Sequence, residues 1–256
     1  MLAPQRQAAI LDRVRATGGV RVSDLATELG VSDMTIRRDL DILADRGLLA
    51  KVHGGATPLD PGATDEPGFA AKSARQRTEK AAIAARAAQL VAPGGAVALS
   101  AGTTTAELAR RLVDVAGLTV VTNSVPVADV FYRGGRGDQT VILTGGVRTP
   151  SDALVGPVAV TAIRGLHVDL LFLGVHGMSE RAGYTTPNLM ESDTNRALIA
   201  AAARLVVLAD HTKWDTVGIS SMAPLAQAQL VVTDAGTTAP ARSTLLDHGV
   251  ELLIAD

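Results

Sequence analysis

The chain lacks cysteine altogether, and this absence excludes several kinds of chemistry. With no cysteine among 256 residues, there can be no disulfide, no thiolate metal site and no cysteine nucleophile. The composition fits a reducing compartment. We therefore expect a cytoplasmic protein.

Long uninterrupted apolar runs are also missing. The N-terminal sequence MLAPQRQAAILDRVRATGG is broken by Arg6, Asp12, Arg13 and Arg15, so it does not have the form of a secretory signal. The longest apolar stretch, ALIAAAARLVVLA, contains Arg204 and is too short to span a bilayer. We expect a soluble protein without a membrane partner.

An excess of positive charge is absent too. Lysine and arginine number 24 against 26 aspartates and glutamates, so the net charge of -2 does not by itself indicate a polyanionic partner. Any basic surface must be local. There is no fixed-period repeat, and 256 residues suffice for two domains or one large one.

A change in composition near residue 58 divides the chain. The segment TPLDPGATDEPGF, from Thr57 to Phe69, contains three prolines and two glycines, which favours an extended linker over helix or strand. We predict an N-terminal domain over residues 1–57, a linker over 58–73 and a larger domain over 74–256.

The N-terminal part has the pattern of three helices followed by a short β wing. Apolar residues at helical spacing predict a first helix that ends near Gly19. Ser23 and Ser32 are placed to cap the second and third helices, and Gly30 separates these two helices. The following segment, LLAKVHGGA, predicts a strand that turns at two glycines.

The third helix has an apolar face and a charged face. At 100° per residue, Ile36 and Leu40 lie on one side, Met34 and Arg38 lie opposite, and Arg37 lies on the flank. In a helix-turn-helix, the first turns of the second helix enter the DNA major groove, where arginine can bind guanine or phosphate. An ordinary solvated amphipathic helix gives the same pattern, and residues 1–57 carry eight basic against seven acidic side chains.

The C-terminal part alternates short apolar runs with helical patterns. Runs that are apolar on both faces, separated by helices, indicate an open, mostly parallel α/β sheet. The predicted strands are AVALS, LTVVT, TVILT, VDLLFLG, RLVVLA and QLVVT.

Ligands of such a sheet bind beyond the carboxyl ends of the strands, so the loops there are the candidate site. In SAGTTTAEL, Gly102 allows close backbone approach, Thr103, Thr104 and Thr105 offer hydroxyls, and a helix begins, which suits a phosphate. A glycine turn followed by a threonine cap would look the same. The other candidates at this edge are Thr122, Asn123, Gly145, Gly146, Gly174, Gly177 and the cation Lys213.

Three further residues are candidates with an equally ordinary interpretation. His176 could touch a ligand or make loop hydrogen bonds. Glu191 could accept sugar hydroxyls, or could complement the helix dipole in a first turn. Asp152 lies near the predicted rim.

The segment LATELGVSDMTIRRDLDILADRGLLAKVHGGA, Leu25 to Ala56, closely resembles the winged helix-turn-helix of the DeoR family of bacterial transcriptional regulators. GTTTAELA, VVTNS, LTGG, GYTTPNLMESDTNRALI and LADHTKW are similar to the sensor domain of that family. The resemblance implies a fold similar to ribose-5-phosphate isomerase and a phosphorylated sugar as effector. It implies DNA binding by Ser32, Met34, Thr35, Arg37, Arg38, Lys51 and His53.

The sequence thus predicts a transcriptional repressor of carbohydrate metabolism genes, released from operator DNA by a sugar phosphate. It predicts a homo-oligomer, dimer or tetramer, without cofactor or metal. Two alternatives remain open. Glu191 and Lys213 could serve an aldose-ketose isomerase, and a purely structural DNA-associated protein would not respond to sugar phosphates.

Overall fold

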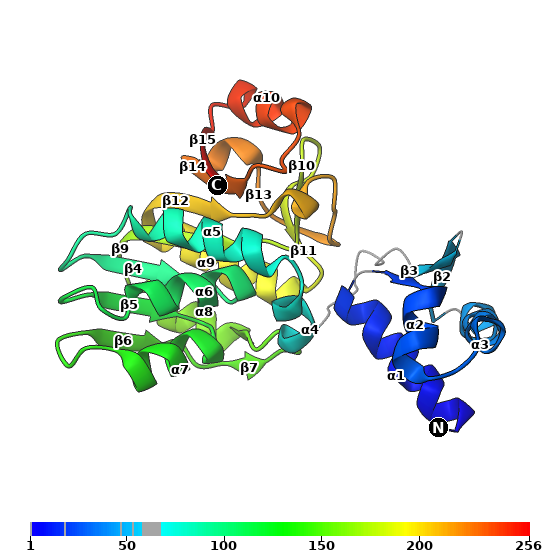
Figure 1. Cartoon of the computed structure of the whole chain (residues 1–256). Coiled ribbons are helices and arrows are strands. Elements are labelled where there is room, and N and C mark those ends of the chain that lie inside the picture. The colour runs from blue at the N-terminus through cyan, green and yellow to red at the C-terminus, as the bar shows by residue number, and fades with distance from the viewer. Residues whose placement is uncertain (1, 18, 47, 53, 58–67) are drawn as a thin grey trace. The chain divides into compact units, whose positions relative to one another are not determined.

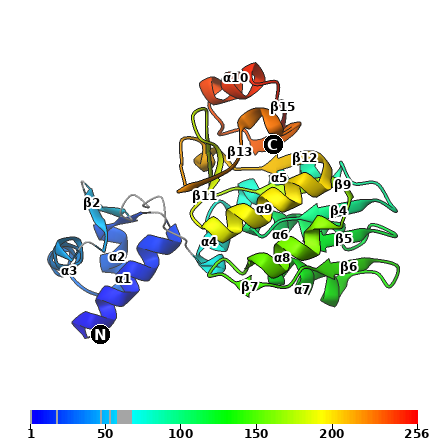
Figure 2. The same cartoon turned by 180° about the vertical axis from the view of Figure 1, so that it is seen from behind.

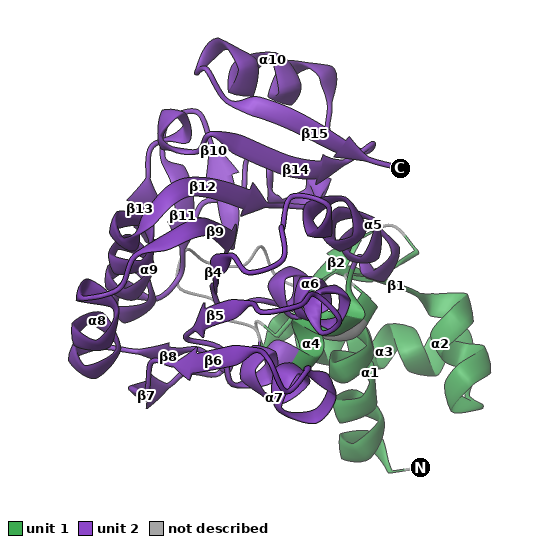
Figure 3. Cartoon of the chain, turned by 90° about the vertical axis from the view of Figure 1, so that its left-hand side faces the viewer, with its two compact units in different colours: residues 1–62, 70–75 green, residues 63–69, 76–256 purple. Residues whose placement is uncertain are grey.

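The computed structural model describes residues 2–17, 19–46, 48–52, 54–57 and 68–256. The chain divides into two compact units, shown in Figure 3. Unit 1 comprises Met1–Gly62 and Ala70–Arg75, and unit 2 comprises Ala63–Phe69 and Gln76–Asp256. The predicted linker residues 58–67 and His53 lie outside the described residues.

Unit 1 contains the predicted three helices and wing. Its helices are α1 (Ala3–Thr17), α2 (Val22–Leu29) and α3 (Asp33–Asp45), and its strands are β1 (Val20–Arg21), β2 (Ala50–Val52) and β3 (Gly55–Thr57). The strands form an antiparallel sheet in the order β1-β3-β2. The fully buried side chains of Ile10, Leu25, Ile36 and Leu40 join the three helices in one core.

The cap predicted for the second helix is wrong, whereas that for the third is confirmed. Helix α2 begins at Val22, one residue before Ser23, because Val22 is buried in the core of unit 1. The Ser23 hydroxyl donates instead to the Asp24 carboxylate at 3.1 Å. Ser32 caps α3 by accepting the Thr35 N–H at 3.3 Å.

Unit 2 is built on a seven-stranded parallel sheet in the order β15-β14-β12-β9-β4-β5-β6. The six predicted runs form β4 (Ala96–Leu99), β5 (Thr119–Thr122), β6 (Thr140–Leu143), β9 (Val168–Gly174), β12 (Ala202–Leu208) and β14 (Leu230–Asp234). An unpredicted strand, β15 (Glu251–Ala255), completes one edge. The predicted α/β fold class is therefore confirmed.

Helices cover both faces of the sheet, as Figures 1 and 2 show from opposite sides. One buried cluster joins α5 (Arg77–Ala88), α6 (Thr103–Leu112) and α7 (Val125–Gly134) to Leu99, Val120 and Phe172. The other joins α8 (Pro157–Arg164), α9 (Leu189–Ala201) and α10 (Ala239–Asp247) to the alternate strand residues Ala98, Val121 and Leu171.

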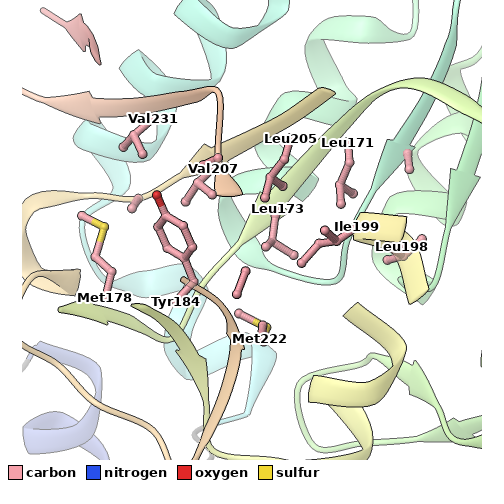
Figure 4. Close-up of a cluster of buried hydrophobic side chains, with 14 of the residues drawn as sticks. Leu171, Leu173, Met178, Tyr184, Leu198, Ile199, Leu205, Val207, Met222 and Val231 are labelled. Carbon is pink, nitrogen blue, oxygen red and sulfur yellow. The ribbon is translucent and has the colours of Figure 1, made fainter. Parts of the chain in front are cut away.

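Smaller elements surround the main sheet. Strands β10 (Gly177–Ser179), β11 (Gly183–Thr186) and β13 (Ser220–Ala223) form an antiparallel sheet, and β7 (Val147–Arg148) pairs with β8 (Leu154–Val155). Two short 3-10 helices are η1 (His211–Lys213) and η2 (Leu225–Gln227). Tyr184 of β11 is fully buried in the second cluster (Figure 4), and burial raises the pKa of its phenol above the ordinary range.

A short helix begins at Phe69, the last residue of the segment predicted to be extended. Helix α4 spans Phe69–Ala74, so residues 69–73 of the predicted linker form regular structure. Within the described residues, no helix is both long and apolar enough to cross a membrane.

Candidate functional site

Helix α3 presents the predicted DNA-reading side chains on its exposed face. Met34 is 75% exposed, and Arg37 and Arg38 are exposed as well, while Ile36 and Leu40 on the opposite face are buried. Neither arginine forms an ion pair with any residue that the structure describes. Both guanidinium groups are therefore available to an anionic partner.

Asp39, the residue that follows these arginines, has a structural role that the sequence did not reveal. Its carboxylate is buried and accepts hydrogen bonds from Arg6 Nε at 2.6 Å and Gln7 Nε2 at 3.0 Å, both on α1. This contact fixes α3 against α1. A buried charge with two donors on another helix cannot be inferred from helical periodicity alone.

The remaining predicted DNA contacts have intramolecular partners. Lys51 of the wing forms an ion pair with Asp41 of α3, and both side chains are about half exposed. The Ser32 and Thr35 hydroxyls lie 2.9 Å apart at the start of α3. A DNA phosphate would have to compete with Asp41 for Lys51.

In unit 2, the order of the parallel sheet defines where a ligand would bind. The chain proceeds from β4 through β5 to β6 on one side, then crosses to β9 on the other side of β4. The loops after β4 and β9 therefore diverge at a topological switch point, where open α/β sheets bind ligands. The predicted candidates Gly102 and Gly174 follow these two strands.

The two glycines lie against each other at this point. A Cβ atom on Gly174 would be 3.8 Å from the Gly102 Cα, and the Gly174 N–H donates to Ser100 Oγ at 2.9 Å. Side chains at both positions would fill the space between the two loops. The sequence prediction that these loops share one edge of the sheet is confirmed by the strand order.

Helix α6 starts at the same point with Gly102 as its N-cap. No side chain in the described part of the chain caps it, in contrast to α3, α7 and α9. Thr105 is buried and donates its hydroxyl to the Gly102 carbonyl at 2.9 Å, Thr104 is buried, and Thr103 is half-buried. The first N–H groups of α6 are thus oriented toward the switch point without a competing side-chain acceptor.

Thr122 and Asn123 are not presented at the surface as the sequence suggested. Both are fully buried. The Thr122 hydroxyl donates to the Leu99 carbonyl at 2.7 Å, and Asn123 Oδ1 accepts the Ala101 N–H at 2.9 Å. The amide nitrogen of Asn123 donates to the Leu154 carbonyl at 3.2 Å. These groups position the loop that carries Gly102.

The candidates after β6 also have structural roles. Gly146 has a φ of 123°, and a Cβ there would lie 2.6 Å from the Val155 carbonyl oxygen, so only glycine fits. Gly145 follows β6 with a φ of 72°. Asp152 has a φ of 60° and forms an ion pair with Arg148 at 2.7 Å.

Lys213, the predicted cation of the site, lies beyond the end of β12. It ends η1, which follows β12, the neighbour of β9. The residue is half-buried, and its ammonium group has no ion-pair partner among the described residues. The peptide groups beyond it pair with β10, because Asp215 N–H donates to the Met178 carbonyl at 2.9 Å. Lys213 is therefore held next to the strand that follows Gly174.

The other three candidates lie at the edges of this region. The His176 N–H donates to the Thr185 carbonyl at 3.1 Å, and a Cβ on Gly177 would lie 2.0 Å from the Thr216 carbonyl oxygen. Glu191 lies in the first turn of α9, and its N–H donates to the Asn188 side chain at 3.2 Å. The glycine at 177 is thus explained by packing alone.

Sequence reasoning missed one pair of side chains at this edge. His211 Nδ1 lies 2.8 Å from Asp234 Oδ1, and the Asp234 carboxylate also accepts the N–H groups of His211 and Gly236 at 2.8 Å each. The pair joins the segment after β12 to the last residue of β14. The only sequence feature pointing to it is an aspartate at the end of an apolar strand.

Both units match models of known protein families. Residues 6–61 match the model of the DeoR-like helix-turn-helix domain, and residues 75–235 match that of the DeoR C terminal sensor domain. An uncharacterised HTH-type transcriptional regulator of Escherichia coli (strain K12), YgbI, is 36% identical over 100% of this chain and 99% of its own.

Two further relatives are similar over nearly their whole lengths. The HTH-type transcriptional regulator GlpR of Haloferax volcanii is 35% identical, covering 99% of this chain and 98% of its own. The transcriptional repressor AccR of Agrobacterium fabrum is 33% identical, covering 91% of this chain and 90% of its own.

Among solved structures, ribose 5-phosphate isomerase A from Methanocaldococcus jannaschii aligns with 54% of this chain and 54% of its own, at 16% identity and a TM-score of 0.40. Similarity at this level carries no argument about function. The two family models and the full-length relatives, by contrast, show the family of this chain. The chain belongs to the DeoR family of helix-turn-helix transcriptional regulators.

Proposed function

We propose that this protein is a repressor that binds operator DNA through α3 and leaves it when a phosphorylated sugar binds to unit 2. The observation that carries the effector part is the start of α6 at Gly102. Its uncapped N–H groups lie beside Gly174 at the switch point of the sheet. Backbone donors and the positive end of the helix dipole favour a phosphate there.

The DNA side of the proposal rests on the exposed face of α3. Arg37 and Arg38 have no intramolecular ion pair within the described chain, and Met34 is exposed beside them. Arginine can bind two acceptors of one guanine in the major groove. Ser32 and Thr35, at the first turn of α3, would contact phosphate or a base edge.

The effector side combines Gly102 and its threonines with the cation of Lys213. A phosphate bound at the α6 N-terminus would have its charge offset by the lysine, while the sugar would extend toward His176, Glu191 and Asp152. Charge-assisted hydrogen bonds of this kind are stronger than neutral ones. Thr122, Asn123, Gly145, Gly146 and Gly177 would shape the loops around the ligand.

Repression requires more than one DNA-reading helix. A single helix reads too few base pairs for genomic specificity, and two-fold operators need two copies, so the protein would act as a homo-oligomer in the cytoplasm. The effector must favour an arrangement of these copies different from the operator-bound one, because a ligand with equal affinity for both states shifts nothing. The sugar phosphate would be bound without being converted.

Operator release is the direct test. A duplex selected from a random DNA library by the protein would be labelled, and its fluorescence anisotropy measured with the protein. Pentose 5-phosphates, hexose 1-phosphates, hexose 6-phosphates, their unphosphorylated sugars and inorganic phosphate would then be added. We expect one phosphorylated sugar to lower the anisotropy and to be recovered unchanged. Release by an unphosphorylated sugar alone would contradict the phosphate site, and conversion of the sugar would show an enzyme.

A further inference from the structure

The chain passes between the two compact units more than once, and one of these passages lies next to a residue that is anchored in unit 2. Residues 63–69 belong to unit 2 and residues 70–75 to unit 1, so one crossing lies directly after Phe69, and the chain returns to unit 2 at Gln76. The Phe69 ring packs partly buried against the α5–α7 cluster of unit 2. Its N–H donates to the Pro150 carbonyl at 3.2 Å. Phe69 is thus an anchored residue of unit 2 at which helix α4 begins.

Pro150 belongs to a short loop, residues 149–153, that is rigidly folded. The Thr149 N–H donates to the Ala153 carbonyl at 2.8 Å, and the Asp152 N–H donates to the Thr149 carbonyl at 3.0 Å. Asp152 has a positive φ of 60°, and its carbonyl accepts the Val125 N–H at 3.2 Å. Because these hydrogen bonds fix the loop at several points, we expect residues 149–153 to move as a rigid unit.

Asn123 connects this loop to the candidate phosphate site. Its Oδ1 accepts the N–H of Ala101, the residue before Gly102, at 2.9 Å. Its Nδ2 donates to the Leu154 carbonyl at 3.2 Å, and its carbonyl accepts the Leu154 N–H at 2.7 Å. One fully buried side chain therefore joins the start of α6 to the residue that follows the 149–153 loop.

An apolar contact runs in parallel with these hydrogen bonds. Ala101, Ala153 and Val155 form a small buried cluster separate from the two large cores of unit 2. Ser124 and Ala153 also form an isolated antiparallel bridge. Movement of the backbone at Ala101 would displace the 149–153 loop through both kinds of contact, because tightly packed groups shift together.

We infer that Asn123 and Phe69 are positioning residues through which the effector acts on DNA binding. Ligand closure at Gly102 shifts Ala101, the shift passes through Asn123 to the 149–153 loop, and Pro150 moves the anchor of Phe69 ahead of α4. The inference rests on the proposed effector site, and it explains why an asparagine is buried after β5. Spatial continuity suggests this route, and only measured coupling between the two ligands establishes it.

The first experiment compares operator release by the wild type and by Phe69→Ala, using the sugar phosphate that releases the wild type in the anisotropy assay. Allosteric effectors commonly change affinity by about 5- to 150-fold. We expect Phe69→Ala to reduce the wild-type change to less than about twofold. Operator affinity without the sugar phosphate, and affinity for the sugar phosphate without DNA, should stay within about twofold of wild type.

Two variants distinguish a loss of coupling between the effector and DNA from a general loss of core packing. Phe131→Ala removes another ring from the same cluster, where Phe131 is 4% exposed, and should lower thermal stability while operator release is retained. Phe69→Leu keeps an apolar anchor and should retain most of the response. An unchanged response of Phe69→Ala would overturn the inference, as would an equal loss in Phe131→Ala.

A second experiment needs no ligand. Hydrogen exchange of the Phe69 amide, which donates to Pro150, would be followed in Asn123→Ala and in the matched variant Asn195→Ala. Asn195 is buried in α9 of the same unit, and its Oδ1 accepts no hydrogen bond from any described residue. We expect faster exchange at Phe69 only in Asn123→Ala, and equal rates in the two variants would overturn the inference.

The two experiments also distinguish this inference from the proposed function. If no sugar phosphate releases the wild type from DNA, the proposed effector mechanism fails. The exchange experiment then still decides whether Asn123 holds the Phe69 anchor. If the wild type responds and Phe69→Ala responds equally, the proposed function stands and the coupling route is wrong.

Discussion

On α3 of unit 1, the side chains that the sequence marks as functional are exposed, whereas in unit 2 many of the polar residues that follow the strands are buried. Arg37 and Arg38 extend into solvent, while Thr122 and Asn123 are used entirely within the fold. The difference teaches that polar character at a strand end does not separate a ligand contact from the scaffold of a loop. On a surface helix, by contrast, the apolar face identifies the exposed face.

The largest effect is expected from a substitution that removes the buried contact orienting α3. Asp39→Ala removes the acceptor of Arg6, whose side chain is only 12% exposed against 4% for Asp39. Removing one member of a buried ion pair costs on the order of 3 kcal/mol. Hydrogen exchange of α1 and α3 amides in the full chain would measure this loss.

Asp41→Ala is the matched control for that variant. The Asp41–Lys51 pair lies on the same helix, but its side chains are 53% and 47% exposed. Exposed pairs contribute less than about 1 kcal/mol. Equal exchange rates in the two variants would contradict the role assigned to Asp39.

The second prediction concerns the cation of the proposed phosphate site. Lys213→Ala should weaken binding of the sugar phosphate by about 1.5–3 kcal/mol, the usual contribution of a hydrogen bond to a charged group. Operator affinity without the sugar phosphate should be unchanged. Titration calorimetry and anisotropy would measure the two affinities.

Arg204→Ala serves as its control. Arg204 lies in β12, the strand that leads to Lys213, but toward its opposite end, where it pairs with Glu251. Full effector binding by Lys213→Ala, or equal loss in both variants, would show that the phosphate binds elsewhere.

The third prediction tests the exposed face of α3. Arg38→Ala should weaken operator binding by about 1–3 kcal/mol if the guanidinium contacts a base, and should relax specificity at that position. Arg13→Ala removes a half-exposed arginine of α1 and should have a smaller effect. Unchanged operator affinity of Arg38→Ala would remove this residue from the reading surface.

The smallest expected effect concerns the wing. Asp41→Asn releases Lys51 from its ion pair and should strengthen DNA binding slightly. If Lys51 then contacts a phosphate, the slope of log affinity against log salt should steepen by about 1. The titration would be repeated at several salt concentrations, and an unchanged slope would place Lys51 away from the DNA.

Much of the fold could be predicted from local pattern. Runs such as VDLLFLG are apolar at nearly every position because parallel strands are covered on both faces, and six of the seven strands were found this way. The sheet β10-β11-β13 was not, because its segments GMS, GYTT and SSMA are short and polar. One of its two pairings also spans a long sequence separation, as Thr185 with Ser221 shows.

The site could be predicted less completely, for a related reason. The loop order and the glycines at Gly102 and Gly174 follow from strand positions, whereas the partners of Asp39 and Asn123 lie on other elements. Ser23 shows that contacts with the core can also override a local capping signal. A good capping residue was overridden because burial of Val22 extends α2 by one residue.

The measurement that tests the central claim most directly is thermal denaturation of the wild type with each sugar phosphate, its unphosphorylated counterpart and inorganic phosphate. A ligand at about 100 times its dissociation constant adds roughly 2.7 kcal/mol of stability to the folded state. We predict a clear rise in melting temperature with one phosphorylated sugar, which Lys213→Ala reduces. No rise with any phosphorylated compound would contradict a phosphate site at the start of α6.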